Sequence, residues 1–173
     1  MSNSSPPVAY FPPTVQRRLI SMVYEMLLGL AVLFLPLLVL EVALQASHTP
    51  LAEHMRQALT FLVLGAYFIH QWNREGQTLA MRTWRIKLVM PGHAHVPLKI
   101  AALRYVLSWM WILPAAMVDY ALGLSKWQAL GAIGAGILAW AATAFLDKDR
   151  QFLHDKVAGT RLLQLPKPEK KKT

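Results

Sequence analysis

The sequence predicts an all-α membrane protein, a four-helix transmembrane bundle with a small cytoplasmic interfacial helix and a β-hairpin. Composition is the first reason: hydrophobic residues make up 55% of the 173 residues and charged residues only 16%, against about a quarter in soluble domains. The second is a set of apolar segments suited to the roughly 30 Å hydrocarbon core of a bilayer. These segments predict spans at about 19–44, 53–71, 100–119 and 127–146.

The first span is the longest apolar run, and it contains two acids, Glu25 and Glu41, and a helix-kinking Pro36. The second span is the least sharply bounded, because its strongly apolar part covers only 58–69. In the fourth span, three closely spaced glycines predict close helix contact: Gly131, Gly134 and Gly136.

The chain divides into three parts. Residues 1–14 are polar and rich in proline, which is typical of a disordered lead. Residues 15–165 hold the membrane domain, and 166–173 form a basic tail. Arg17 and Arg18 before an apolar run resemble a signal peptide, but the run is about twice the usual 7–15 residues, so we expect an uncleaved anchor.

The basic residues predict the orientation of these spans. With four spans and both termini inside, fifteen of the eighteen Lys and Arg residues lie on the cytoplasmic side, and only Arg56 and Lys126 lie outside. A three-span alternative would put the Lys-rich tail outside, against the positive-inside rule. The scarcity of Arg before residue 17 argues against a transit peptide and favours a bacterial inner membrane. The basic segments then indicate anionic lipid headgroups, and not nucleic acid, as the partner.

Two cytoplasmic segments are expected to be structured. Gly76 opens a turn into a short interfacial helix, with Trp84 at headgroup level. Alternation over 85–96 around Pro91-Gly92 indicates a β-hairpin, to which 159–165 could add a third strand. Gly76 and Gly159 are expected to need positive φ or a close backbone approach.

Three charges within the spans are candidates for a structural ion pair or an ion pathway: Arg18, Glu25 and Arg104. Glu25 follows Arg18 by seven residues and shares its helix face, while Arg104 begins the third span at a similar depth. Glu25 could therefore pair with either arginine or carry a proton or cation, and both readings stay open. Glu41 and Asp119 lie near the outer ends and are expected at the interface.

His154-Asp155 could shuttle protons, since a carboxylate orients an imidazole that titrates near neutral pH. The simpler interpretation is that this pair pins a surface segment, 151–157. His93 and His95 lack metal-ligand spacing and are expected in a surface loop. The sequence holds no nucleophile elbow, zincin or phosphate-loop motif and no cysteine, so we expect no enzyme, no metal and no cofactor.

Several motifs together resemble the RDD family of membrane proteins, over about 15–165. The family's Arg-Arg-Leu with an Asp seven residues later is similar to Arg17-Arg18-Leu19 with Glu25 in place of that Asp. The family's Gly-Gln-Thr-Leu-Gly-x-Arg matches Gly76-Gln77-Thr78 through Arg82, with Ala80 for the last Gly, and Leu103-Arg104-Tyr105 matches its Leu-Arg-Tyr.

Near the end, the family's Asp, His-Asp and Gly-Thr are matched by Asp147, His154-Asp155 and Gly159-Thr160. The longer segment between Asp119 and Asp147 suggests a four-helix version of a fold that often looks three-spanned. The resemblance implies a membrane protein, and some members are linked to monovalent cation–proton exchange.

Two functions follow as expectations. The first is a small transporter of protons or monovalent cations, forming a homo-oligomer along the Gly131–Gly136 face because four helices alone enclose little pathway. The second is a non-catalytic membrane interaction or assembly protein that docks through its hairpin and tail.

The charge asymmetry gives a testable topology. Reporters fused at Gly92 and at Thr173 should read cytoplasmic, and one at Thr49 should read external. An external reporter at Thr173 would contradict the four-span arrangement.

Overall fold

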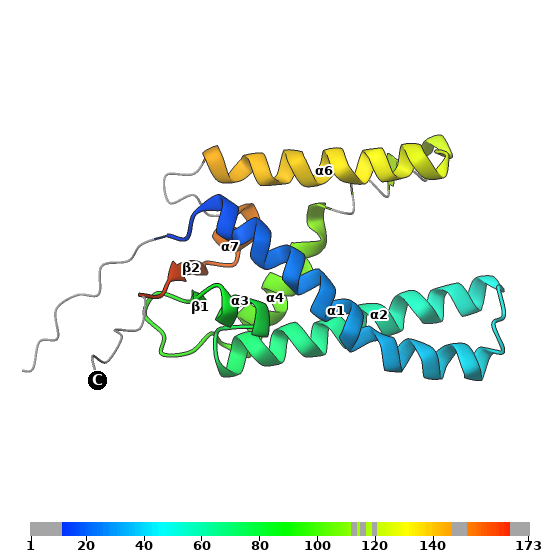
Figure 1. The fold of residues 1–173 in the computed structure, drawn as a ribbon, viewed down its shortest axis with the longest axis horizontal. Coiled ribbons are helices and arrows are strands. Elements are labelled where there is room, and N and C mark those ends of the chain that lie inside the picture. The colour runs from blue at the N-terminus through cyan, green and yellow to red at the C-terminus, as the bar shows by residue number, and fades with distance from the viewer. Residues whose placement is uncertain (1–11, 112–113, 115–116, 119–120, 147–151, 167–173) are drawn as a thin grey trace, which may run out of the picture.

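A computed structural model describes residues 12–111, 114, 117–118, 121–146 and 152–166 of the chain (Figure 1). Asp119, Asp147, most of the N-terminal lead and almost all of the basic tail lie outside the described residues.

Helix α1 (Val15–Leu44) contains the predicted first span. It begins where the side chain of Thr14 accepts a hydrogen bond from the Arg17 amide, and it ends at Gln45, whose φ of 50° is left-handed. Among the described residues it is the one helix long and apolar enough to cross a membrane, and only 11% of its most apolar window is buried. A core helix of a soluble protein would instead bury that apolar surface.

Helix α2 (Pro50–Arg74) folds back along α1, so that the two form a long hairpin (Figure 1). Arg56 fastens the turn of this hairpin, because its guanidinium lies 2.5 Å and 3.0 Å from the two carboxylate oxygens of Glu41. The same side chain donates to the carbonyl oxygen of Ser47 at 2.7 Å. Glu41 is thus held by an arginine at the turn that joins α1 to α2.

Helix α4 (Leu98–Ser108) continues into the short 3₁₀ helix η1 (Trp109–Trp111) and packs against α2. Aromatic rings fill this contact, with the Phe61 and Tyr105 centroids 5.1 Å apart, and the Tyr105 hydroxyl donates to the Phe61 carbonyl at 2.7 Å. Gly65 permits the approach, since a Cβ there would lie 3.0 Å from the Tyr105 ring.

Helix α6 (Lys126–Leu146) lies above α1 in Figure 1 and contacts α7 (Leu153–Val157) and η1. A Cβ added at Gly131 or at Gly134 would meet nothing within 4 Å. The close helix contact predicted for these two glycines is therefore not made within the described part of one chain.

The short elements gather at one end of the long helices and form what we call the cap (Figure 1). The cap comprises α3 (Leu79–Thr83), β1 (Ile86–Val89), α7 and β2 (Arg161–Gln164). β1 and β2 pair antiparallel, with Ile86 opposite Gln164 and Val89 opposite Arg161.

The hairpin predicted over 85–96 is wrong, because the partner of β1 is β2, from the far end of the chain. A turn does follow β1, and Gly92 has a φ of 80°. The chain after this turn packs against the core and does not form a strand. Val96 is buried, and its carbonyl accepts a hydrogen bond from Asn73 at 2.9 Å. Pro97 then precedes α4, so no length is left for a second strand.

The hydrophobic core lies where the cap meets α2 and α4. Its buried members are Trp72, Met81, Ile86, Leu88, Val96, Ala101, Tyr105 and Leu162. Further along α1 the apolar side chains are exposed, as for Phe34 (68%) and Val42 (72%). The structure is therefore tightly packed at one end and apolar on its outside elsewhere.

Gly76 meets both expectations for a required glycine. Its φ is 67°, and a Cβ would lie 2.5 Å from the carbonyl oxygen of Leu88. Gly159 has nearly the same φ, 68°, but a Cβ there meets nothing within 4 Å.

Gly76 and Gly159 together give a controlled test of the close approach between Gly76 and the Leu88 carbonyl. Gly159→Ala should lower the free energy of unfolding by about 1–2 kcal/mol, the cost of left-handed backbone. Gly76→Ala should cost more, because it adds a clash with backbone, and should lower the folded yield. Thermal unfolding of the two purified variants checks this, and equal losses would contradict the role of the Leu88 contact.

Candidate functional site

Five elements bring polar side chains together at the junction of the cap and the long helices. One group, which we call the arginine cluster, consists of Arg18, Arg104, His154 and Asp155. The other, the Glu25 site, consists of Glu25, Tyr67 and Thr78.

Arg104 and Asp155 form the centre of the arginine cluster. Nε and Nη2 of Arg104 each lie 2.8 Å from Oδ1 of Asp155, and the side chains are 7% and 0% exposed. The guanidinium also lies over the ring of Trp72, 4.1 Å from its centroid. Arg104 is thus neutralised by a carboxylate and packed on an aromatic face, which is how a buried guanidinium is tolerated.

The ion pair considered between Arg104 and Glu25 is not formed. Both the Nε and the Nη2 of Arg104 are directed at Asp155, which α7 places against α4. Asp155 lies 51 residues further along the chain, so helical spacing holds no sign of this contact.

Arg18 also faces α7. Its side chain is buried, its Nε donates to the carbonyl oxygen of Pro13 at 3.2 Å, and its guanidinium lies 5.5 Å from the ring centroid of Phe152. The rings of Phe152 and His154 stack, with centroids 5.9 Å apart. Arg18 and Glu25 therefore share one helix without forming an ion pair with each other among the described residues.

The interpretation of His154-Asp155 as a pin on a surface segment stays a prediction, and both side chains lie on the inner face of that segment. His154 is 5% exposed and Asp155 is fully buried, whereas Leu153 (41%) and Val157 (57%) point outward. The outward side chains of helix α7 are thus apolar, and its inward side chains are polar because they face the buried arginines.

Burial sets the protonation states of this pair. Loss of hydration lowers the pKa of His154 to about 4, although the neighbouring Asp155 carboxylate opposes the shift. For Asp155, burial alone would raise the pKa, but attraction to Arg104, His154 and Arg18 outweighs it and the pKa lies below the ordinary value. Near neutral pH the imidazole is therefore neutral and the carboxylate ionised, which disfavours a proton shuttle through His154.

The Glu25 site is held by hydroxyl groups. The Thr78 hydroxyl donates to Oε2 of Glu25 at 2.5 Å, and the Tyr67 hydroxyl lies 3.4 Å from Oε1. Thr78 is fully buried and also caps α3, since its Oγ1 accepts from the Met81 amide at 3.2 Å. Within the described residues Glu25 makes no ion pair.

The Gly76-Gln77-Thr78 motif connects Glu25 to the sheet. The Gly76 carbonyl accepts from the Leu88 amide at 2.7 Å, and Nε2 of Gln77 donates to the Ile86 carbonyl at 2.8 Å. Both bonds occupy the edge of β1 that faces away from β2. The motif therefore binds β1 through Gly76 and Gln77, and Glu25 through Thr78.

The remaining candidates have structural positions or lie apart. Arg82 is half exposed and pairs with Glu75, away from both groups. The Thr160 amide donates to the Asp155 carbonyl at 2.9 Å and ends α7 after the turn at Gly159. Asp147 lies outside the described residues.

Sequence reasoning missed Tyr67, Trp72 and Phe152, which contact the three candidate charges Glu25, Arg104 and Arg18. Each contact joins different elements, so no spacing signal could reveal it. Aromatic residues at the ends of spans are ordinarily interpreted as anchors in the membrane interface, so their contacts with buried charges were not predicted.

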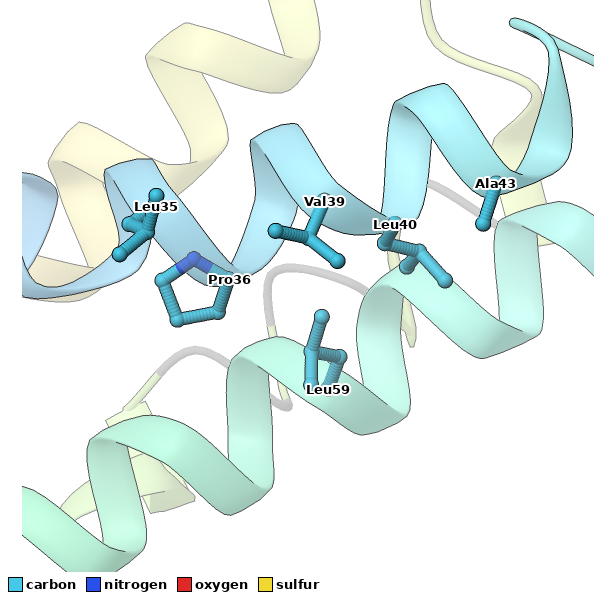
Figure 2. Close-up of a pocket in the computed structure, with 6 residues that line it drawn as sticks. All are labelled: Leu35, Pro36, Val39, Leu40, Ala43 and Leu59. Atoms are coloured by element: carbon cyan, nitrogen blue, oxygen red, sulfur yellow. The ribbon is translucent and has the colours of Figure 1, made fainter.

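An open groove between α1 and α2 does not coincide with these groups (Figure 2). It encloses about 490 Å³, and its lining is wholly apolar: Leu35, Pro36, Val39, Leu40, Ala43 and Leu59. It begins ten residues beyond Glu25, about 15 Å along α1.

Removing one member of the Arg104–Asp155 pair should strand a buried charge. We expect Arg104→Gln or Asp155→Asn alone to cost about 3–5 kcal/mol and the double variant to recover much of that loss. Combining Glu25→Gln with Arg104→Gln should bring no recovery. Unfolding in detergent measures these differences.

The exposed Arg82–Glu75 pair is the matched control, and its single variants should change stability by about 0–1 kcal/mol. Recovery in the Glu25 double variant instead of the Asp155 one would contradict the assignment.

His154 should make the protein sensitive to mild acid. Its pKa is about 4 when folded and 6.5 ordinarily, so the unfolded chain binds the extra proton between these values. Stability should fall by up to about 3 kcal/mol as the pH drops through that window. Asp155, whose pKa is lowered, loses its contribution only below about its ordinary 3.8.

Melting temperatures at neutral pH and at pH of about 5 test this sensitivity. The drop should shrink in His154→Gln and persist in His95→Gln, which alters an exposed histidine. An undiminished drop in His154→Gln would contradict the assignment.

Comparison with known proteins identifies the family. The model of the RDD family matches residues 12–159, which includes every described element except β2. No curated protein and no solved structure matches the chain. The matched range and the exposed apolar helix α1 lead to one conclusion: this chain belongs to the RDD family and is a membrane protein.

Proposed function

We propose that this protein is a small transporter that exchanges protons or monovalent cations at Glu25. The observation that carries the proposal is the way in which Glu25 is held. It lies on the apolar helix α1, bound by the hydroxyls of Thr78 and Tyr67 and by no ion pair among the described residues. A carboxylate kept at this depth without a fixed counter-ion is typical of an ion pathway.

The proposal includes four spans with both termini in the cytoplasm of a bacterium, in its inner membrane. Residues 127–146 carry no charge and would extend about 30 Å as a helix, enough to cross the hydrocarbon core. The basic asymmetry of the sequence puts the cap on the cytoplasmic side. Glu25 then lies near the cytoplasmic end of the bundle.

The proposal also includes a homo-oligomer that contacts anionic lipid headgroups. Gly131 and Gly134 on α6 have open space around them, which suits a helix from a second copy. We propose no enzymatic reaction and no cofactor.

A second candidate is a non-catalytic membrane interaction or assembly protein. The Arg104–Asp155 pair favours it, because this pair is buried and joins α4 to α7, as a structural contact would. In this case Glu25 would serve only to fix α3 through Thr78.

Flux measurements in proteoliposomes separate the two candidates. A proton gradient imposed on vesicles with the full-length protein should drive exchange against a monovalent cation. Glu25→Gln should abolish this flux while the protein stays folded, and Glu25→Asp should retain part of it.

Glu41→Gln is the matched control, since it alters an acid on the same helix that Arg56 binds at the other end. It should leave the flux unchanged. No flux from the unaltered protein with any monovalent cation would favour the assembly protein.

A further inference from the structure

The two oxygens of Glu25 are held unequally. Oε2 receives the short hydrogen bond from Thr78, at 2.5 Å, while Oε1 has only the Tyr67 hydroxyl, at 3.4 Å. A bond to a carboxylate at the shorter distance is a strong one, and the longer distance is near the limit for a hydrogen bond.

Thr78 acts as a donor to the ionised Glu25, because a carboxylate can only accept. A threonine hydroxyl carries one hydrogen and two lone pairs, and here a lone pair already accepts the Met81 amide. Its hydrogen points to Oε2, and the cap of α3 fixes the oxygen in place. One lone pair of Thr78 stays free, but its hydrogen is already engaged at 2.5 Å, and a neutral Glu25 with its proton on Oε1 still offers Oε2 as the acceptor.

Tyr67 is held less closely to Glu25, although the backbone of Leu79 also hydrogen-bonds its hydroxyl. Its ring packs edge-on against Phe68, with centroids 5.1 Å apart, and its hydroxyl can donate or accept by rotating about the C–O bond. Its oxygen lies beside the one Glu25 oxygen that lacks a strong donor.

We propose that Glu25 binds a proton on Oε1, and that Tyr67 then changes from donor to acceptor while Thr78 stays the donor to Oε2. The proton leaves a hydronium ion, whose O–H bond breaks to give water, and forms one O–H bond on Oε1, so that the carboxylate becomes the neutral acid. Tyr67 and Thr78 are positioning residues in this step. The inference rests on the proposed function and names the proton as the ion that binds at this acid.

The donor geometry favours a proton over a metal cation. A cation beside Oε2 would need a lone pair from Thr78, but the Thr78 hydrogen occupies that direction. Tyr67 offers the other hydroxyl oxygen at the site, too few for the oxygen shell of a hard cation.

Few other charges act on this acid. Arg104 on α4 attracts the carboxylate although it is bound to Asp155. On α3, Arg82 is exposed and paired with Glu75, and on α1 Arg18 lies two turns earlier and faces Phe152. The same surroundings persist when Tyr67 or Thr78 is altered, so changes in proton binding report on the two hydroxyls.

Infrared titration of the full-length protein in nanodiscs tests the inference. The carboxyl signal of Glu25 is obtained by difference from Glu25→Gln, and its midpoint gives the proton affinity without any transport. Tyr67→Phe removes both the weak donor to the carboxylate, at 3.4 Å, and the acceptor of the acid proton. Because the acceptor bond is the stronger of the two in the proposed step, the affinity should fall about tenfold. Thr78→Val removes a donor to the charged form and should raise it about tenfold.

Thr78→Ser keeps the hydroxyl and should titrate as the unaltered protein does. Thr78→Val also removes the cap of α3. If Thr78→Val does not fold, the midpoint of Tyr67→Phe alone tests the inference. Shifts in the same direction, or an unchanged midpoint in Tyr67→Phe, would overturn the inference.

The two levels of the proposal fail separately. Opposite shifts without flux from the unaltered protein would retain the proton site and remove the transporter. Flux that depends on Glu25, with an unchanged midpoint in Tyr67→Phe, would retain the transporter and remove this inference.

Discussion

The buried contact between Arg104 and Asp155 is the constraint on which the rest of the structure depends. A guanidinium that is 7% exposed cannot stay charged without a partner, and the partner comes from α7, 51 residues later. Once α7 is fixed against α4, the turn at Gly159 directs the chain into β2, and β2 pairs with β1. One ion pair therefore joins α4 to the last described segment of the chain.

The two acids, Asp155 and Glu25, have different surroundings. Asp155 is surrounded by positive charge, its pKa is lowered, and it stays ionised as a fixed counter-ion. Glu25 has two hydroxyl groups as neighbours instead. A hydroxyl can change from hydrogen-bond donor to acceptor when the acid gains a proton, whereas an arginine can only donate. Two carboxyl groups in different surroundings can thus take different roles at the same end of the protein.

The sequence predicted the helices better than the contacts between them. Apolar runs marked α1, α2 and α6 to within a few residues, and the glycine at 76 marked a left-handed turn. The sequence predicted that 159–165 could join the sheet, but it missed β2 as the direct partner of β1 and Asp155 as the partner of Arg104, because nothing local encodes these contacts. The burial of His154 was missed since α7 has only five residues, too few for a periodic pattern.

The apolar outside of the long helices limits how an ion could pass Glu25. Beyond this acid, the groove between α1 and α2 is lined only by apolar side chains, from Leu35 to Ala43 and Leu59 (Figure 2). An ion crossing that depth needs polar groups or water, which this face of one chain does not supply. Exposed residues on α6, such as Trp127 (82%) and Leu138 (73%), are equally apolar and suit lipid or a second copy. The groove therefore offers no pathway from Glu25 to the other side, and the transporter proposal places that pathway between copies of the chain.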